Sequence, residues 1–224
     1  MNKFCDKIIG KDYKYLNTAV LIPRVRIGRE DHLLFQQRSP DIIQGGEICF
    51  PGGRVDAVRD RSLKDTAIRE TCEELGIEKR RIRVLSKLGT LIAPVGVAVE
   101  AYVASLTIGG LQDLSISKAE VARVFTLPLA WFRANPPKEH RLTVEIQPFR
   151  YNDKNEKEHL LPVRDYALPA RYEEPWTGRE HPVFVYRTDF GVIWGITAEL
   201  VREYVQQEAV KRTSLLRNHA KNND

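Results

Sequence analysis

The sequence predicts an α+β domain in which a β-sheet is layered against helices. Two observations lead to this prediction. The 224-residue chain contains many short apolar segments typical of strands, but few segments with helical periodicity. A helix also follows the Pro-Gly-Gly turn at residues 51–53, so that a strand end leads towards a helix start. These features favour a layered fold and leave the order of the strands open.

The strand predictions follow apolar runs that are separated by polar turns. Residues 18–25 (TAVLIPRV) and 32–38 (HLLFQQR) flank the turn IGRED, which predicts a β-hairpin. Further strands are predicted at 47–50, 83–88, 97–106, 142–149, 160–163 and 182–186. Pro128 is expected to begin a short helix after a strand, and residues 196–211 predict a closing amphipathic helix.

The helix after the Pro-Gly-Gly turn has clear start and stop signals. Ser62 is a preferred N-cap, and Asp65 three residues later resembles a capping box. Gly76 stands where a left-handed residue commonly ends a helix. One face carries the small or apolar residues Ala67, Ile68, Thr71, Cys72 and Leu75. This pattern predicts that one side of the helix faces the core and that the other exposes a row of carboxylates.

Three glutamates of this helix, Glu70, Glu73 and Glu74, are spaced i, i+3 and i+4, which places them on one face. Like charges this close destabilise an isolated helix by roughly 0.2–0.5 kcal/mol per pair. A cluster that weakens its own helix indicates that a cation binds there. Carboxylate oxygens suit Mg²⁺ or Mn²⁺, with substrate phosphates completing the coordination.

Composition and charge narrow the classes of function. Apolar residues make up 42% of the chain and charged residues 29%, as in ordinary globular proteins. No apolar run approaches the roughly 20 residues that cross a bilayer, and the N-terminus lacks a signal-peptide core, so we expect a cytoplasmic protein with no membrane partner. Cys5, Cys49 and Cys72 lack metal-type spacing. The net charge of +5 favours a polyanionic small molecule, and the absence of nucleic-acid motifs argues against that partner.

Residues 53–77 resemble the motif of the Nudix hydrolases, G-x5-E-x7-R-E-U-x-E-E-x-G-U, in which U is a bulky apolar residue. Its second half is present as RETCEELGI at residues 69–77, with Thr71 at the first U position. The first half departs from the motif, because Arg69 lies sixteen positions after Gly53 where the motif has fourteen. The expected first glutamate therefore falls on Arg59 or Arg61, and the nearest carboxylates are Asp56 and Asp60.

A narrower resemblance is to the coenzyme A pyrophosphatase subgroup, whose pattern reads LLxxRSxxLxxHxGExxFPGGxxDxxD. The residues that match at or near their places are Leu33, Arg38, Ser39, Gly46, Glu47, Phe50 and Pro51. One residue is gained between Leu34 and Arg38, and Gln44-Gly45 replaces the His-x of the pattern. AEVARVFTLPL and IWGITAEL resemble later segments of the subgroup. Residues 134–180 cannot be placed.

The resemblance implies a mixed β-sheet sandwiched between helices (α/β/α), here with an extra β excursion. It implies one Nudix-like domain over residues 1–224, with a core at about 17–133 and 181–210 and an insertion at about 134–180. A small-molecule diphosphate is the implied partner, and a homodimer is left open.

The resemblance also implies roles for individual residues. Glu70 and Glu74 would be the main ligands of Mg²⁺ or Mn²⁺, and Glu73 would be a further ligand or the catalytic base. Glu120 is another candidate base. Arg69, four residues before Glu73, would pair with it and orient it.

Three residues outside the helix are expected at the substrate. Gly52 and Gly53 would let the backbone turn tightly near the phosphates. Arg38 would contact a phosphate, although a solvent-facing position at a strand end is the alternative.

The implied activity is hydrolysis of the diphosphate of coenzyme A or acyl-CoA to 3′,5′-ADP and (acyl-)phosphopantetheine. Another nucleoside diphosphate derivative, such as ADP-ribose, NADH or a nucleoside triphosphate, is the alternative substrate. The arginines at the expected first-glutamate position keep open a second alternative, a catalytically impaired protein that binds or regulates through a nucleotide.

Overall fold

The computed structural model describes residues 8–221, and these fall into two compact units. Unit 2 is Glu139–Val183, and unit 1 contains the described residues before and after it. The boundaries of the predicted insertion and the assignment of the whole chain to one domain remain predictions. Cys5 lies outside the described residues, whereas Cys49 and Cys72 are free thiols.

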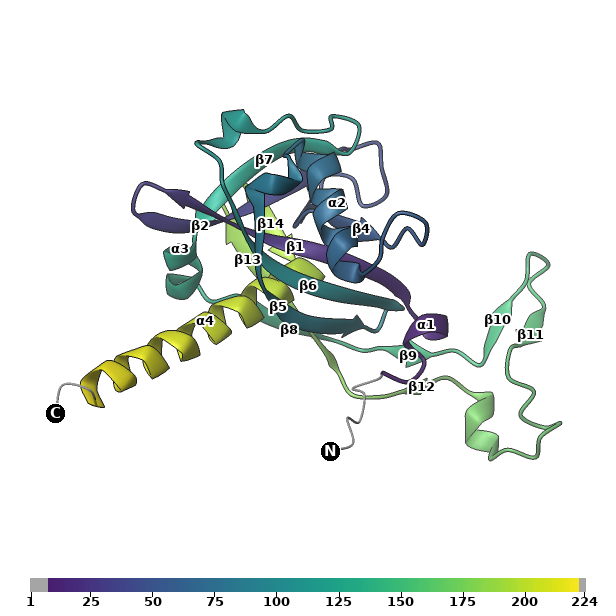
Figure 1. The fold of residues 1–224 in the computed structure, drawn as a ribbon. Helices are drawn as coiled ribbons and strands as arrows, with labels where there is room; N and C mark the ends of the chain where they lie inside the picture. Colours follow the sequence, from purple (N-terminus) through teal and green to yellow (C-terminus); the bar gives the residue numbers. More distant parts are fainter. Residues whose placement is uncertain (1–7, 222–224) are drawn as a thin grey trace. The chain divides into compact units, whose positions relative to one another are not determined.

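Unit 1 is built on a seven-stranded sheet in the order β3-β2-β1-β6-β5, with β4 paired to β1 and β7 paired to β2 (Figure 1). Its strands are β1 (Leu16–Ile27), β2 (Glu30–Arg38), β3 (Ile48–Cys49), β4 (Gly52–Arg54), β5 (Ile82–Ala93), β6 (Val97–Leu106) and β7 (Val121–Pro128). The strand β1 is parallel to β6 and antiparallel to β2 and β4, so the sheet is mixed. The predicted first hairpin is confirmed, with Val25 opposite His32.

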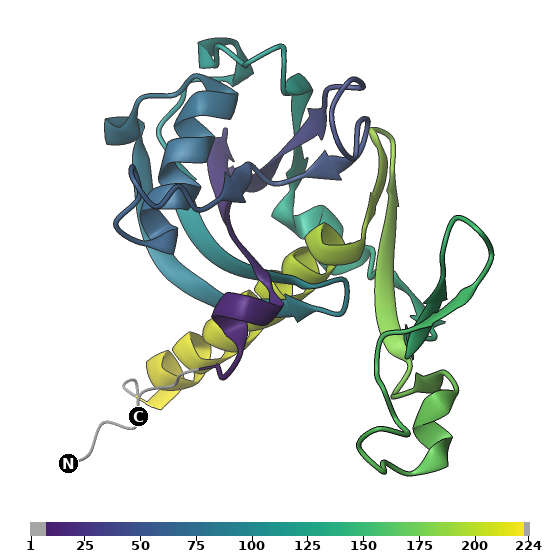
Figure 2. The same ribbon diagram turned by 90° about the vertical axis from the view of Figure 1, so that its right-hand side faces the viewer.

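Helices cover both faces of this sheet (Figures 1 and 2). They are α1 (Lys11–Lys14), α2 (Leu63–Leu75), α3 (Leu129–Ala134) and α4 (Gly195–Lys221), with the 3₁₀ turns η1 (Lys79–Arg81) and η2 (Leu111–Asp113). Alternate residues of β2 enter two separate cores, because successive side chains of a strand point to opposite faces. Leu34 packs with Ala67 and Leu75 of α2, and Phe35 packs in the other core with residues of α3 and α4. The predicted α+β fold, a mixed sheet between helices, is confirmed.

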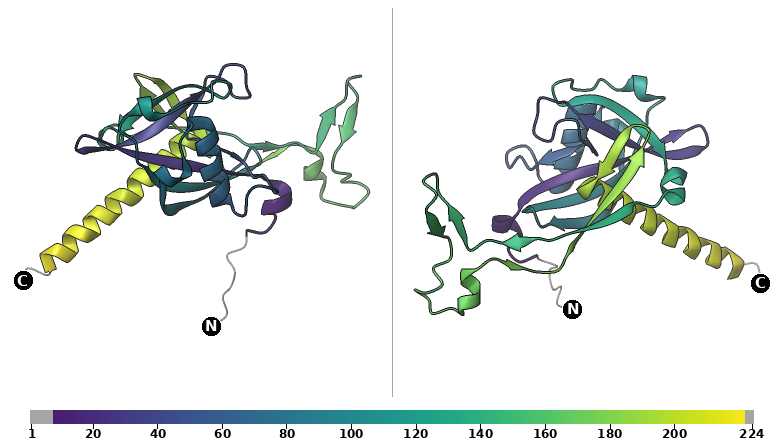
Figure 3. Two further views of the ribbon diagram at one scale, coloured as in Figure 1. Left: turned by 45° about the horizontal axis from the view of Figure 1, so that its top comes forward. Right: turned by 180° about the vertical axis from the view of Figure 1, so that it is seen from behind.

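A second hairpin leads into α4, as the right-hand view of Figure 3 shows. It consists of β13 (His181–Thr188) and β14 (Gly191–Trp194). The two strands are antiparallel, with Val185 opposite Trp194. The sequence predicted β13 and α4 but not β14. The buried residues Tyr186 and Ile193 of this hairpin belong to the same core as Phe35.

Unit 2 has short, mostly exposed strands. It contains β9 (Glu145–Ile146) paired with β12 (Trp176–Thr177), β10 (Phe149–Tyr151) paired with β11 (Lys157–His159), and the 3₁₀ turn η3 (Ala170–Glu173); β8 (Lys138–Leu142) leads into it. The predicted strand at 142–149 is confirmed only in part, since it is broken into the end of β8, β9 and the start of β10, and the predicted strand at 160–163 is wrong. Pro148 and Pro162 interrupt these segments because proline cannot donate a backbone hydrogen bond.

No helix among the described residues is long and apolar enough to cross a membrane.

Candidate active site

The helix α2 begins and ends at the residues that the sequence indicated. The Ser62 side chain accepts a hydrogen bond from the Asp65 backbone N–H at 3.2 Å, which satisfies one of the free donors of the first turn. Gly76 ends the helix in the left-handed region, at φ +61°. A Cβ atom there would lie 2.1 Å from the Ser115 carbonyl oxygen, so only glycine fits both the backbone conformation and the contact. The helix is therefore fixed at both ends.

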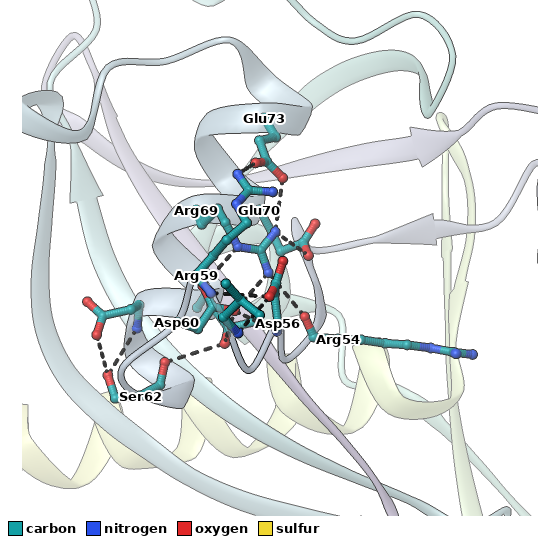
Figure 4. Close-up of polar contacts among 12 residues, drawn as sticks. Arg54, Asp56, Arg59, Asp60, Ser62, Arg69, Glu70 and Glu73 are labelled. Carbon is teal, nitrogen blue, oxygen red and sulfur yellow. Dashed lines mark hydrogen bonds and ion pairs between the residues drawn. The ribbon is translucent and has the colours of Figure 1, made fainter.

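Arg69 connects this helix to the loop before it (Figure 4). Its Nε and Nη2 atoms donate to the two carboxylate oxygens of Asp60 at 2.8 and 2.9 Å, a bidentate geometry. Its Nη1 atom donates to Glu70 at 2.8 Å and to Glu73 at 2.9 Å. Its Nη2 atom also donates to the Arg54 carbonyl at 3.1 Å. One guanidinium thus holds two of the three helix glutamates in place.

Asp60 is the carboxylate that the loop supplies to Arg69. Its side chain is only 1% exposed, and it also accepts hydrogen bonds from the Asp56 backbone N–H and the Thr66 hydroxyl, at 2.9 and 2.8 Å. The hydrogen bonds from Arg69 hold the pKa of the Asp60 carboxyl well below its usual range. Asp60 lies one residue from each position at which the motif places its first glutamate. Motif spacing brought out Asp56 and Asp60 as the nearest carboxylates but could not choose between them, because the loop is longer than the motif allows.

Glu70 and Glu74 approach the Pro-Gly-Gly turn closely. The Gly52 backbone N–H donates to the Glu74 carboxylate at 2.9 Å. A Cβ atom on Gly53 would lie 2.4 Å from the Glu70 carboxyl carbon, and one on Gly52 would lie 2.3 Å from the Ala19 carbonyl oxygen. The two glycines therefore make room for a glutamate on one side and for β1 on the other.

The environment of these two glutamates disfavours their charged forms. Burial raises the pKa of Glu74 to about 7, and the charges of Glu70 and Glu120 act in the same direction, whereas the Gly52 N–H and the buried Gln36 amide oppose them. Burial also raises the pKa of Glu70, against the attraction of Arg69. The expectation that α2 exposes its whole carboxylate row is wrong, since Glu74 is 4% exposed. The turn at residues 51–53 covers it.

Glu73 has a different setting from the other two glutamates. Its side chain is 39% exposed and is held by Arg69 on one oxygen and by Arg59 on the other. Arg59, one of the two arginines at the expected first-glutamate position, therefore lies against the carboxylate face of α2 (Figure 4).

The remaining predicted residues come from two neighbouring segments. Glu120 precedes β7, where its carbonyl accepts from the Ser39 backbone N–H at 2.9 Å, and its charge acts on both Glu70 and Glu74. Arg38 ends β2, and its Nε donates to the Ile43 carbonyl at 3.0 Å. Burial and the Glu74 charge raise the pKa of the Cys49 thiol to about 11, and Arg38 opposes this shift. Cys49 thus lies close enough to interact with Arg38 and with Glu74.

The donor set fits a hard divalent cation. Glu70 and Glu74 supply carboxylate oxygens, and their mutual repulsion is the kind that a bound Mg²⁺ or Mn²⁺ would relieve. Among the described residues, no three His, Cys, Asp or Glu side chains converge on one point in the conformation seen. Glu70 and Glu73 are instead hydrogen-bonded to Arg69.

Sequence reasoning missed Gln36 as a neighbour of the site. This side chain is fully buried on β2, opposite Cys49 of β3, and its amide helps to lower the pKa of Glu74. The available signal was a polar residue after the apolar run LLF, where strand alternation would place an inward-facing side chain.

The fold and the helix with its bonded carboxylates define a domain of the Nudix class. Residues 16–170 match the family model of the NUDIX domain, and the chain belongs to the Nudix hydrolase family. It is therefore an enzyme that acts on phosphorus-containing anhydrides, a hydrolase of nucleoside diphosphate derivatives. Members of this family generally need divalent metal ions.

Individual relatives share this assignment. The chain is 27% identical to the Uncharacterized Nudix hydrolase NudL of Photorhabdus laumondii, over 87% of this chain and 86% of the relative. It is 30% identical to the NudL protein of Salmonella dublin, over 89% and 88% of the two chains. Among solved structures, a binary complex of the Caenorhabditis elegans Ap4A hydrolase aligns with a TM-score of 0.44 and 23% identity, covering 52% of this chain and 83% of that chain.

Proposed function

We propose that this Nudix hydrolase cleaves the diphosphate of coenzyme A or acyl-CoA, with Mg²⁺ or Mn²⁺, to give 3′,5′-ADP and (acyl-)phosphopantetheine. The observation that carries the proposal is the pair Glu70 and Glu74, held against the Gly52–Gly53 turn where burial raises the pKa of both carboxyls. Buried carboxylates in such a setting are stabilised strongly by a bound cation, and a diphosphate substrate binds as a complex with a divalent cation.

Glu70 and Glu74 are the proposed main ligands of the ion, with Glu73 as a further ligand. A divalent ion, when bound, neutralises charge on the diphosphate and lowers the pKa of an attacking water. Glu73, half-exposed beside Arg69, and Glu120, whose charge acts on both ligands, are the two candidates to accept the proton of that water.

Arg69 acts in this scheme as a positioning residue. Its bidentate bond to buried Asp60 fixes the guanidinium, which in turn orients Glu70 and Glu73 through Nη1. Gly53 leaves the space that the Glu70 carboxylate occupies, and Gly52 lets the turn lie against β1 while its N–H binds Glu74.

The substrate assignment rests on the pattern LLxxRS to FPGG and on Arg38. This arginine acts on the thiol of Cys49, the residue of β3 whose pKa the Glu74 charge also raises, and a guanidinium in this region of β2 and β3 suits a phosphate.

A substrate panel tests the proposal. The protein is incubated with Mg²⁺ or Mn²⁺ and with coenzyme A, ADP-ribose, NADH or a nucleoside triphosphate, and the products are identified by mass. We expect 3′,5′-ADP and phosphopantetheine from coenzyme A. Turnover of another panel member with coenzyme A untouched would contradict the substrate assignment.

Two matched variants test the site. Glu74→Gln should abolish turnover while the fold is retained, since it removes one charge from the metal ligands. Glu78→Gln makes the same change on a side chain that is 62% exposed beyond the helix, and it should leave turnover unchanged. Activity that survives in Glu74→Gln would show that the ligand assignment is wrong.

A further inference from the structure

An open groove lies between the loop at residues 45–48 and the β13–β14 hairpin. Its volume is about 570 Å³, and its apolar lining comes chiefly from Ile48, Val185, Phe190, Val192 and Trp194. Small-molecule sites usually measure about 300–1,000 Å³. The groove is therefore large enough for part of a substrate.

The strand β14 presents apolar side chains on both of its faces. Ile193 is fully buried in the core, as a strand in contact with the sheet requires. Val192 and Trp194 point the other way and remain 49% and 48% exposed, and Phe190 before them is 37% exposed. A strand face open to water is normally polar. Three adjacent exposed apolar residues along one groove indicate a surface that binds an apolar group.

Contacts with the sheet hold the groove in shape. Arg123 of β7 donates to the Phe190 carbonyl at 2.7 Å and to the Gln37 side chain at 2.6 Å. The Phe190 ring stacks on Phe125, with centroids 4.4 Å apart. Gly191 lets β14 come close to β3, because a Cβ atom there would lie 3.1 Å from Ile48 Cδ1. The hairpin tip is thus fixed, and little ordering is needed when a ligand binds.

The described residues that line the groove include no cation, although Arg123 donates to two of them, Gln37 and Phe190. Among the described residues that line it, Glu47 alone is charged, and it is an anion. Glu47 of the groove and Gly52 of the site are only five residues apart in the chain. An extended chain spans at most about 3.6 Å per residue, so Gly52 lies within roughly 18 Å of Glu47. A pantetheine arm, which resembles a short extended peptide with two amides, has a reach of this order.

We propose that this groove binds the acyl chain at the end of the pantetheine arm, so that Val192 and Trp194 set the preference for acyl-CoA over free coenzyme A. The inference rests on the proposed function and extends it to the acyl group. An apolar chain is the part of such a substrate that carries no charge and gains from leaving water.

The first test measures kcat/KM for coenzyme A and for acetyl-, butanoyl-, hexanoyl- and octanoyl-CoA. We expect an increase of about two- to fourfold per methylene group over the first carbons. Val192→Asp should lower the octanoyl-CoA to coenzyme A ratio by about tenfold or more, because the chain would meet a charge. Trp194→Ala should lower it through loss of apolar contact. Val95→Asp, at a site that is 78% exposed in the β5–β6 turn, should leave the ratio unchanged. An unchanged ratio in both groove variants would overturn the inference.

The second test does not depend on turnover. Octanoyl-pantetheine, which has no diphosphate, is titrated into isotope-labelled protein, and backbone amide shifts are followed by NMR. We expect saturable shifts at residues 45–48 and 190–194, which disappear in Val192→Asp and persist in Val95→Asp. This result together with no turnover of any CoA ester would support the groove and contradict the proposed substrate. Turnover of coenzyme A without these shifts would contradict the assignment of the groove to the acyl chain and leave the proposed substrate standing.

The same variants distinguish a protein partner from an acyl chain. If the groove were instead the contact between two copies of this chain, the wild-type protein would be dimeric by light scattering and Val192→Asp monomeric. Such a result, with the acyl dependence unchanged, would overturn the inference.

Discussion

The second half of the Nudix motif lies in the helix α2 and the first half in the loop at residues 54–61, and the two halves differ in how they reach the site. The helix supplies Glu70, Glu73 and Glu74 through spacing alone, since residues three and four apart share a face. The loop is two residues longer than the motif, yet one of its carboxylates, Asp60, still accepts hydrogen bonds from Arg69.

Only the helical half of the motif depends on local geometry. Helical spacing cannot change without moving the glutamates to another face. A loop can change its length if one of its carboxylates still reaches the arginine, because the Arg69–Asp60 contact is made in space and not by position in the sequence. We therefore expect Asp60 to stabilise the contact between the loop and α2, and Arg59 to contribute little.

The largest expected effect follows from Asp60→Asn. This substitution removes the buried carboxylate that binds Nε and Nη2 of Arg69, whose remaining charged partners, Glu70 and Glu73, contact Nη1 only. It should lower the free energy of unfolding by about 3 kcal/mol. Urea denaturation measures the change. Asp41→Asn, on an exposed residue of another loop, is the control and should change stability by less than about 0.5 kcal/mol. Equal free energies of unfolding for the two variants would show that Asp60 does not stabilise the contact between the loop and α2.

The pH dependence of stability also tests the pairing of Asp60 with Arg69. The folded-state pKa of Asp60 is held below its ordinary value of 3.8, chiefly by hydrogen bonds from Arg69, so the unfolded chain binds the proton at higher pH than the folded chain. The contribution of Asp60 to stability is therefore fully present above about pH 5 and declines as pH falls below 4. We expect the stability gap between the wild-type protein and Asp60→Asn to be constant from pH 5 to 8 and to narrow towards pH 2.5. A constant gap down to pH 2.5 would contradict this pairing.

A smaller effect is expected where the loop joins the helix. Ser62→Ala removes the acceptor for the Asp65 N–H and should cost about 1 kcal/mol of stability. Ser86→Ala, on an exposed position of β5, makes the same change without a cap and serves as the control. Thermal unfolding of both variants measures the difference, and a loss of the same size in Ser86→Ala would show that the cap is not its cause.

The smallest effect is expected for Arg59→Ala. The pair with Glu73 is exposed, with 54% of the Arg59 side chain accessible, and Arg69 still holds Glu73 without it. The free energy of unfolding should fall by less than about 1 kcal/mol in urea denaturation. A loss as large as that of Asp60→Asn would mean that the arginine, and not the aspartate, organises the loop.

The parts of the fold that could be predicted from sequence are those with local causes. Ser62 and Gly76 bound α2 as their chemistry requires, and the apolar runs around IGRED form the first hairpin. The burial of Glu74 could not be predicted, because the turn at residues 51–53 covers a side chain more than twenty positions later. The short strand β14 was missed, since its four residues carry little periodicity.

For the site, sequence placed the carboxylates of α2 but not the contacts between segments. Asp60 and Gln36 reach Arg69 and Glu74 only after the chain folds. The groove beside Trp194 arises in the same way, from the approach of β14 to the loop at residues 45–48. Unit 2 offered the weakest signal, because its strands are two to three residues long and mostly exposed.

The central claim is that the carboxylate face of α2 binds a divalent cation, and Mn²⁺ binding tests it most directly. Free Mn²⁺ is followed by electron paramagnetic resonance at pH 8, above the pKa of about 7 to which burial raises Glu74. We expect saturable Mn²⁺ binding. The affinity should weaken about tenfold or more in Glu74→Gln, a loss of at least about 1.4 kcal/mol, and should be unchanged in Glu78→Gln. Equal Mn²⁺ affinity in the wild-type protein and Glu74→Gln would contradict the claim.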